Sequence, residues 1–147
     1  MNTLTGEITA ITTEHNISLV NVLAGGQLFY SLILDTPDTS PWLKNGATVR
    51  LLFKETEVMI ALPTSSPLQI SVRNQIPCHI TAIVSGIILC ELTLALTPLT
   101  RTPPAGEAGE LHIKAIITRA ACDALSLKEN DPIIALIKTN EVSLAHD

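Results

Sequence analysis

The chain has 147 residues, of which 46% are hydrophobic and 16% are charged, and its formal net charge is −5. This length and apolar content suffice for one ordinary domain or two very small ones with a compact core. The acidic balance and an aromatic content of only 3% argue against a nucleic-acid partner, which normally requires a basic surface and stacking rings.

Membrane and metal sites are not indicated either. The apolar stretch Ile83–Leu96 is interrupted by polar residues and is too short to span a bilayer. No secretory signal precedes Gly6, so we expect a cytoplasmic protein without direct membrane insertion. The cysteines and histidines lack disulfide-framework and metal-ligand spacing. We therefore expect buried or half-buried thiols, and no metal ligand among Cys78, Cys90, Cys122, His15, His79, His112 and His146.

The first half of the chain alternates apolar and polar residues over short segments, which is typical of β-strands. In chain order we expect strands at residues 7–14, 17–23 and 27–34, then a closing pair joined around the Lys-Glu-Thr of residues 54–56. The following linker, Pro-Thr-Ser-Ser-Pro at residues 63–67, is short and permits close packing of what lies on either side.

The second half repeats this order. We expect strands at residues 79–85, 87–96 and 111–118, and a closing pair joined around the Lys-Thr-Asn of residues 138–140. Residues 97–110 are rich in Pro, Gly and Thr, which predicts a solvated loop between two strands.

One short helix is expected from Arg119 to Leu127, with Thr118 as its N-cap and alanines and leucines behind it. The matching segment of the first half, residues 34–43, contains two prolines. Because proline breaks a helix interior, we expect that helix to be shortened or lost there.

The two halves are copies of one unit. The sequence LLFKETEVMIAL at residues 51–62 matches ALIKTNEVSLAH at residues 135–146, at an offset of 84 positions. The sequence ITAI occurs at residues 8–11 and again at residues 80–83, at an offset of 72. The second copy therefore holds 12 extra residues, the difference between the two offsets, which we place in the loop at 97–110.

About five short strands per copy predict a mostly all-β protein of two tandem, small, OB-like five-stranded β-barrels with one short helix. We place the first barrel at residues 1–62 and the second at residues 68–147. Barrels this small are marginal alone, so we expect them to pack on each other and on a second chain.

Three ordered motifs in the second copy carry a resemblance to a known family. They are Ser71-Val-Arg73-Asn74, then Ile-Thr118-Arg, then Ile-Lys138. In this order they resemble the molbindin-like tandem TOBE domains, which bind molybdate. The first copy has the barrel pattern without these motifs, and in this asymmetry the chain is most similar to the C-terminal accessory domain of the ATP-binding subunit of molybdate ABC importers.

The resemblance implies a function and a set of binding residues. It implies that the chain binds the tetrahedral oxyanion molybdate or tungstate as the regulatory, ligand-sensing domain of such an importer, fused to or associated with an ABC ATPase domain at the cytoplasmic face of the inner membrane. It also implies a homodimer, with a pocket shared between the chains. The expected oxyanion ligands are Ser71, Arg73, Asn74, Thr118, Lys138 and Thr139.

The chemistry of these side chains is consistent with that ligand. Molybdate at neutral pH is a dianion with four acceptor oxygens and no proton, so its site should contain donors and no carboxylate. Ser71, Arg73 and Lys138 are donors, and Thr118 can accept from a helix amide while its own proton goes to the anion. Asn74 could instead hold the turn through its side chain. Thr139 is a weaker candidate.

The first copy keeps only one of these positions. Lys54 stands at the position of Lys138, but Leu34 stands where the second copy has Thr118. A single lysine at a strand end is most often a solvated charge. We therefore predict that the Ser71–Asn74 stretch is a binding feature that only the second copy has.

Two other functions fit the same pattern. One is a stand-alone molybdate storage or buffering protein, and the other is a non-binding TOBE dimerisation module of another ABC importer. An enzyme is not indicated, because we find no nucleophile with a nearby base, no paired acids and no GxxxxGK motif followed by Ser or Thr. We expect no catalytic residue and no cofactor.

Overall fold

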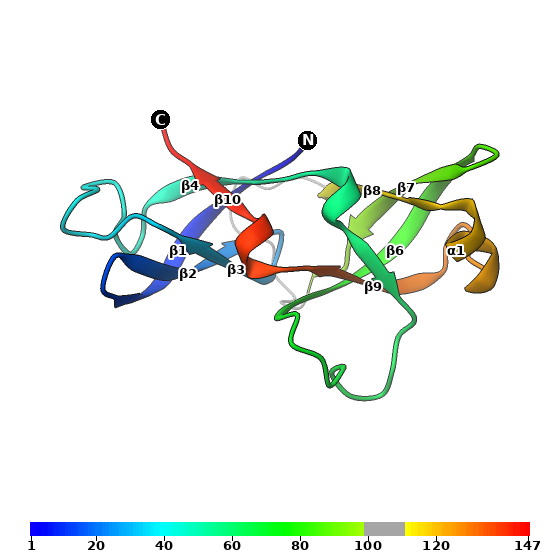
Figure 1. Cartoon of the computed structure of the whole chain (residues 1–147), viewed down its shortest axis with the longest axis horizontal. Helices are drawn as coiled ribbons and strands as arrows, with labels where there is room; N and C mark the ends of the chain where they lie inside the picture. Colours follow the sequence, from blue (N-terminus) through cyan, green and yellow to red (C-terminus); the bar gives the residue numbers. More distant parts are fainter. Residues whose placement is uncertain (99–110) are drawn as a thin grey trace.

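The structure is a computed structural model and describes residues 1–98 and 111–147. Two curled five-stranded sheets lie side by side along the long axis of the molecule (Figure 1). The predicted class, two OB-like barrels with one short helix, is confirmed. From residue 99 onward, the loop expected at residues 97–110 lies outside the described residues.

Each copy supplies five strands in the predicted order. The first copy contains β1 (Asn2–Glu14), β2 (Ile17–Ala24), β3 (Gln27–Ile33), β4 (Thr48–Phe53), the 3-10 turn η1 (Glu55–Glu57) and β5 (Met59–Ala61). The second copy contains β6 (Asn74–Ser85), β7 (Leu89–Leu96), β8 (His112–Thr118), the helix α1 (Arg119–Ala124), β9 (Pro132–Ile137), the 3-10 turn η2 (Thr139–Glu141) and β10 (Ser143–Ala145).

The first strand of each copy is long enough to pair with two neighbours. β1 pairs with β4 over its first half and with β2 over its second half, and a bulge lies between Ile8 and Ala10. β6 divides in the same way between β9 and β7, with its bulge between Ile80 and Ala82. A bulge bends and twists a strand locally, so each sheet curls at the same position of the repeat.

The last strand of each copy belongs to the sheet of the other copy. The strand orders are β10-β4-β1-β2-β3 in the first sheet and β5-β9-β6-β7-β8 in the second. Leu144 of β10 pairs with Leu51 of β4, and Ile60 of β5 pairs with Ala135 of β9. The closing strands expected around residues 54–56 and 138–140 are therefore present, but they cross between the two barrels.

The two barrels share one hydrophobic core, as expected from their small size. Buried residues of both sheets form a single cluster, which includes the stacked rings of Phe29 and Phe53 at 6.4 Å between centroids. Polar side chains also join the two copies: the Ser31 hydroxyl donates to the Val142 carbonyl at 2.6 Å, and the buried Gln27 amide donates to the Pro77 carbonyl at 3.0 Å.

The helix α1 begins where expected and ends earlier than expected. Thr118 is its N-cap, and its Oγ1 accepts the Ala121 N–H at 3.1 Å. The helix ends at Ala124 rather than Leu127, because Ser126 takes a left-handed backbone conformation with φ of 52°. The segment at residues 34–43 in the first copy forms turns and no helix, which confirms the effect of its prolines.

Within the described ranges, no helix is both long and apolar enough to cross a membrane.

Candidate functional site

Two neighbouring strands bring the first predicted residues together. Asn74, the first residue of β6, pairs with Ile137, the last residue of β9. Arg73 therefore precedes β6 and Lys138 follows β9 at the same end of the second sheet. Ser71 lies two residues before Arg73, and all three side chains are exposed. We call Ser71, Arg73 and Lys138 the donor group.

Neither cation of the donor group has a carboxylate partner in the described part of the chain. None of the ion pairs found within the described residues includes Arg73 or Lys138. Lys138 also makes no side-chain hydrogen bond to the turn η2 that it caps. Like charges at adjacent strand ends repel each other. A bound anion would remove that repulsion, so the arrangement suits a negatively charged ligand.

Thr139, the first residue of η2, follows Lys138 directly and is half-buried. It is therefore at the same end of the second barrel as the donor group. Five of the six predicted ligands, Ser71, Arg73, Asn74, Lys138 and Thr139, lie at this end.

Asn74 lies between these residues in sequence, but its side chain is directed inward. It is fully buried, with 0% exposure. Its Oδ1 accepts the Tyr30 N–H at 2.7 Å, and its Nδ2 donates to the Tyr30 carbonyl at 2.9 Å. Tyr30 belongs to β3, so the amide joins the start of β6 to the other sheet, rather than holding its own turn.

The first copy has an equivalent asparagine that the motif search missed. Asn2 is buried, its Oδ1 accepts the Lys114 N–H, and its Nδ2 donates to the Lys114 carbonyl, both at 2.8 Å. The offset of 72 that relates the two ITAI segments also relates Asn2 to Asn74, so this offset could have identified it. The asparagine is therefore common to both copies, whereas the position of Arg73 holds Met1 in the first copy.

Thr118 lies at the opposite end of the second barrel from the donor group. It ends β8 and pairs with Leu89 at the start of β7, next to the hairpin that joins β6 and β7. Figure 1 shows α1, which Thr118 caps, at the outer end of the molecule. Its hydroxyl oxygen accepts a helix amide, and no hydrogen bond donated by this hydroxyl is found within the described part of the chain.

The counterpart of the donor group in the first copy is surrounded by carboxylates. Lys54 lines a pocket of about 150 Å³ together with Glu57 and Glu141. Next to it, where the second copy has a threonine, stands Glu55, whose pKa is lowered by its hydrogen bond from the Met1 ammonium. Carboxylates repel a dianion, so this end of the first barrel is poorly suited to bind one.

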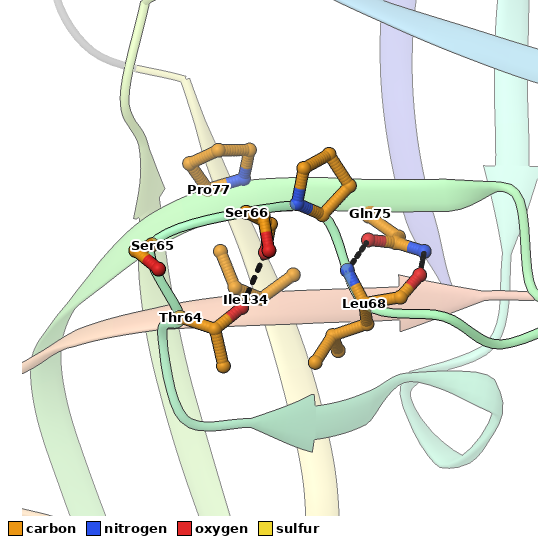
Figure 2. A pocket seen from close by; sticks show the side chains of 8 residues that line it. Thr64, Ser65, Ser66, Leu68, Gln75, Pro77 and Ile134 are labelled. Carbon is orange, nitrogen blue, oxygen red and sulfur yellow. Dashed lines mark hydrogen bonds between the residues drawn. The ribbon is translucent and has the colours of Figure 1, made fainter.

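A larger pocket, of about 310 Å³, lies beneath the linker at residues 63–67 (Figure 2). No residue of the donor group lines it. Its floor is the outer face of β6 and β9, and none of the six predicted ligands lines it. The lining residues are Thr64, Ser65, Ser66, Pro67, Leu68, Gln75, Pro77 and Ile134. Its uncharged lining gives no reason to place an anion there.

The three cysteines are free and buried, as predicted, and burial raises the pKa of the Cys78 thiol to about 12. Within residues 1–98 and 111–147, no group of three or more His, Cys, Asp or Glu side chains could hold a metal ion.

Comparisons with known proteins agree with the fold and with the motifs. Residues 70–144, just over half of the chain, match the sequence model of the TOBE domain. No curated protein sequence matches the chain significantly. Among solved structures, the chain is similar to the cytoplasmic molybdate-binding protein ModG with molybdate bound. The TM-score is 0.82 at 25% identity, and the match covers 99% of this chain and 96% of that one.

Proposed function

The chain belongs to the TOBE domain family, and from this premise we propose that it binds molybdate in the cytoplasm. The observation that carries the proposal is the donor group: Ser71, Arg73 and Lys138 lie exposed at one end of the second sheet, and among the described residues neither cation has an ion-pair partner. The similarity to ModG over nearly the full length of both chains supports the choice of molybdate as the ligand.

The chemistry of the donor group favours a fully deprotonated oxyanion. A guanidinium, an ammonium and a hydroxyl all donate hydrogen bonds, and charge-assisted bonds of this kind are the strongest that side chains offer. A protonated phosphate would need an acceptor for its proton. Tungstate has the same charge and shape as molybdate, and its binding stays a prediction.

We favour a stand-alone molybdate-binding protein, of the storage or buffering kind, over the importer subunit. The two barrels of this chain account for nearly all of ModG, which supports a unit of this size as a binding protein. The role of regulatory domain for an ABC ATPase at the inner membrane has no support from these comparisons and stays a prediction.

We further propose that the site is shared between two chains of a homodimer. Thr118 and the donor group lie at opposite ends of a barrel whose strand β6 has 12 residues. Because a strand rises roughly 3.3 Å per residue, one anion cannot touch both ends of the same barrel. A pocket that combines Thr118 of the partner subunit with the donor group would supply more donors and exclude water.

Calorimetric titration with molybdate, tungstate, sulfate and phosphate tests the proposed function. We expect saturable binding of molybdate and tungstate, and weaker binding of sulfate, which is smaller, and of phosphate, which carries a proton. Absence of binding by all four anions would contradict the proposal and favour the non-binding dimerisation module.

Mixing two inactive variants tests the shared pocket. The first is Thr118→Val, and the second combines Ser71→Ala with Lys138→Met. If the pocket is shared, each mixed dimer contains one pocket with all its donors, so molybdate binding should reappear at up to one site per dimer. Sedimentation must first show a dimer and subunit exchange. No recovery after proven exchange would place all ligands on one chain.

A further inference from the structure

The segment at residues 68–73, which carries Ser71 and Arg73, has no regular secondary structure of its own. Such a segment would have to be ordered when an anion binds, and ordering costs affinity. The first two residues of β6 follow it directly, and their side chains point to opposite faces of the sheet. These two residues are Asn74 and Gln75, and the hydrogen bonds of both side chains restrain this segment.

Gln75 holds the segment from the outer face of the sheet. Its Oε1 accepts the Leu68 N–H at 3.0 Å, and its Nε2 donates to the Leu68 carbonyl and to the Val72 carbonyl, each at 3.1 Å. Figure 2 shows the side chain of Gln75 reaching the backbone of Leu68. These bonds close a loop of which Ser71 is a part.

Asn74 fixes the other end of the segment from the inner face. Both polar atoms of its amide are bonded to the Tyr30 backbone, and the side chain has 0% exposure. The residue next to Arg73 is thus tied to β3 of the other barrel. Both polar atoms of this buried amide are already engaged by the Tyr30 backbone. The side chain can therefore orient its neighbours, and it has no exposed polar atom to offer to the anion.

We infer that Asn74 and Gln75 are positioning residues for the oxyanion site. They hold Ser71 and Arg73 beside Lys138 before the anion arrives, so that little ordering is left for the binding step. This inference rests on the proposed function, and it reassigns Asn74 from the set of expected ligands to their support.

The internal repeat provides a matched control. Asn2 makes the same pair of hydrogen bonds in the first copy, to the backbone of Lys114, and is similarly buried. The residue before it is Met1, where the second copy has Arg73. Asn2→Ala therefore removes an equivalent structural contact without touching the proposed site.

The experiment compares Asn74→Ala, Gln75→Ala and Asn2→Ala in the full chain, at a temperature at which circular dichroism shows all of them folded. Molybdate is titrated by calorimetry. We expect affinity to fall about ten- to hundredfold in Asn74→Ala and Gln75→Ala, as when supporting residues of a metal site are removed. In Asn2→Ala affinity should change by no more than about twofold, because the Asn2 side chain bonds to the Lys114 backbone and to none of the proposed ligands.

Hydrogen exchange of residues 70–73 without anion is the second measurement. It should be faster in Asn74→Ala and Gln75→Ala than in wild type, and unchanged in Asn2→Ala. Equal affinity losses in Asn74→Ala and Asn2→Ala, or unchanged affinity in both Asn74→Ala and Gln75→Ala, would overturn the inference. If the wild-type protein binds no molybdate, the proposed function fails. The hydrogen-exchange rates of residues 70–73 then decide by themselves whether Asn74 and Gln75 hold the segment. Should Asn74→Ala not fold, Gln75→Ala carries both measurements.

Discussion

A buried asparagine begins the first strand of each copy. The hydrogen bonds of its side-chain amide explain why an asparagine is suited to this position. β3 is one edge strand of the first sheet and β8 one edge strand of the second, and an edge strand has backbone groups without a strand partner. A side-chain amide presents an N–H donor and a C=O acceptor on one edge, so Asn74 pairs with the Tyr30 backbone and Asn2 with the Lys114 backbone as an extra strand residue would. The same two contacts join the barrels.

The two equivalent lysines should differ in their effect on anion binding. We expect Lys138→Met to weaken molybdate binding about 10- to 150-fold, because a charge-assisted hydrogen bond contributes about 1.5–3 kcal/mol. Lys54→Met should have little effect, because Lys54 shares its surroundings with Glu57 and Glu141. Parallel calorimetric titrations measure both affinities. Equal losses would mean that the first copy keeps a working site.

The helix α1 is short, and its start depends on one side chain. The described helix has six residues, and its first turn is closed by the bond from the Ala121 N–H to the Thr118 hydroxyl. A helix of this length has little stability of its own and relies on its cap and on packing of Cys122, its buried residue. The cap therefore affects stability independently of any ligand.

Replacement of the cap should destabilise the protein in the absence of anion. We expect Thr118→Val to lower the free energy of unfolding by about 1 kcal/mol, because a helix amide loses its acceptor. Thr118→Ser keeps the hydroxyl and should unfold close to wild type. Urea denaturation followed by circular dichroism measures the difference. Identical midpoints for valine and serine would show that the cap contributes nothing.

At the scale of the whole molecule, the exchange of β5 and β10 makes the two barrels interdependent. Each sheet takes its fifth strand from the other copy, and the buried residues form one cluster. Trp42 of the first copy stacks on His146, which follows β10, with 4.5 Å between ring centroids. Neither sheet is complete without the other half of the chain.

Separate production of residues 1–62 and 68–147 tests this interdependence. We expect each half alone to unfold without a cooperative transition, because each lacks a strand and exposes core residues. Mixing the halves should restore the β-sheet spectrum and shift the emission of Trp42, the only tryptophan in the chain, as its ring packs on His146. A cooperative transition in either half alone would contradict the expectation.

Local sequence patterns determined the strands, the helix start and the repeat. Strand alternation, the Thr118 cap and the prolines of residues 34–43 act over a few residues, so they can be recognised without knowledge of the fold. The order of the motifs also identified the donor group, because residues 71–73 and Lys138 fall at strand ends that a barrel brings together. These predictions rest on short-range physics or on the resemblance.

Tertiary structure decided which residues pair across the molecule. The strand exchange joins β4 to β10, some 90 residues later, and the repeat pattern shows only which residues are equivalent, not which are partners. The inward direction of Asn74 and the distance of Thr118 from the donor group follow from burial and from barrel geometry. Burial is a collective property of both sheets, so a single motif could not reveal that the asparagine side chain points inward.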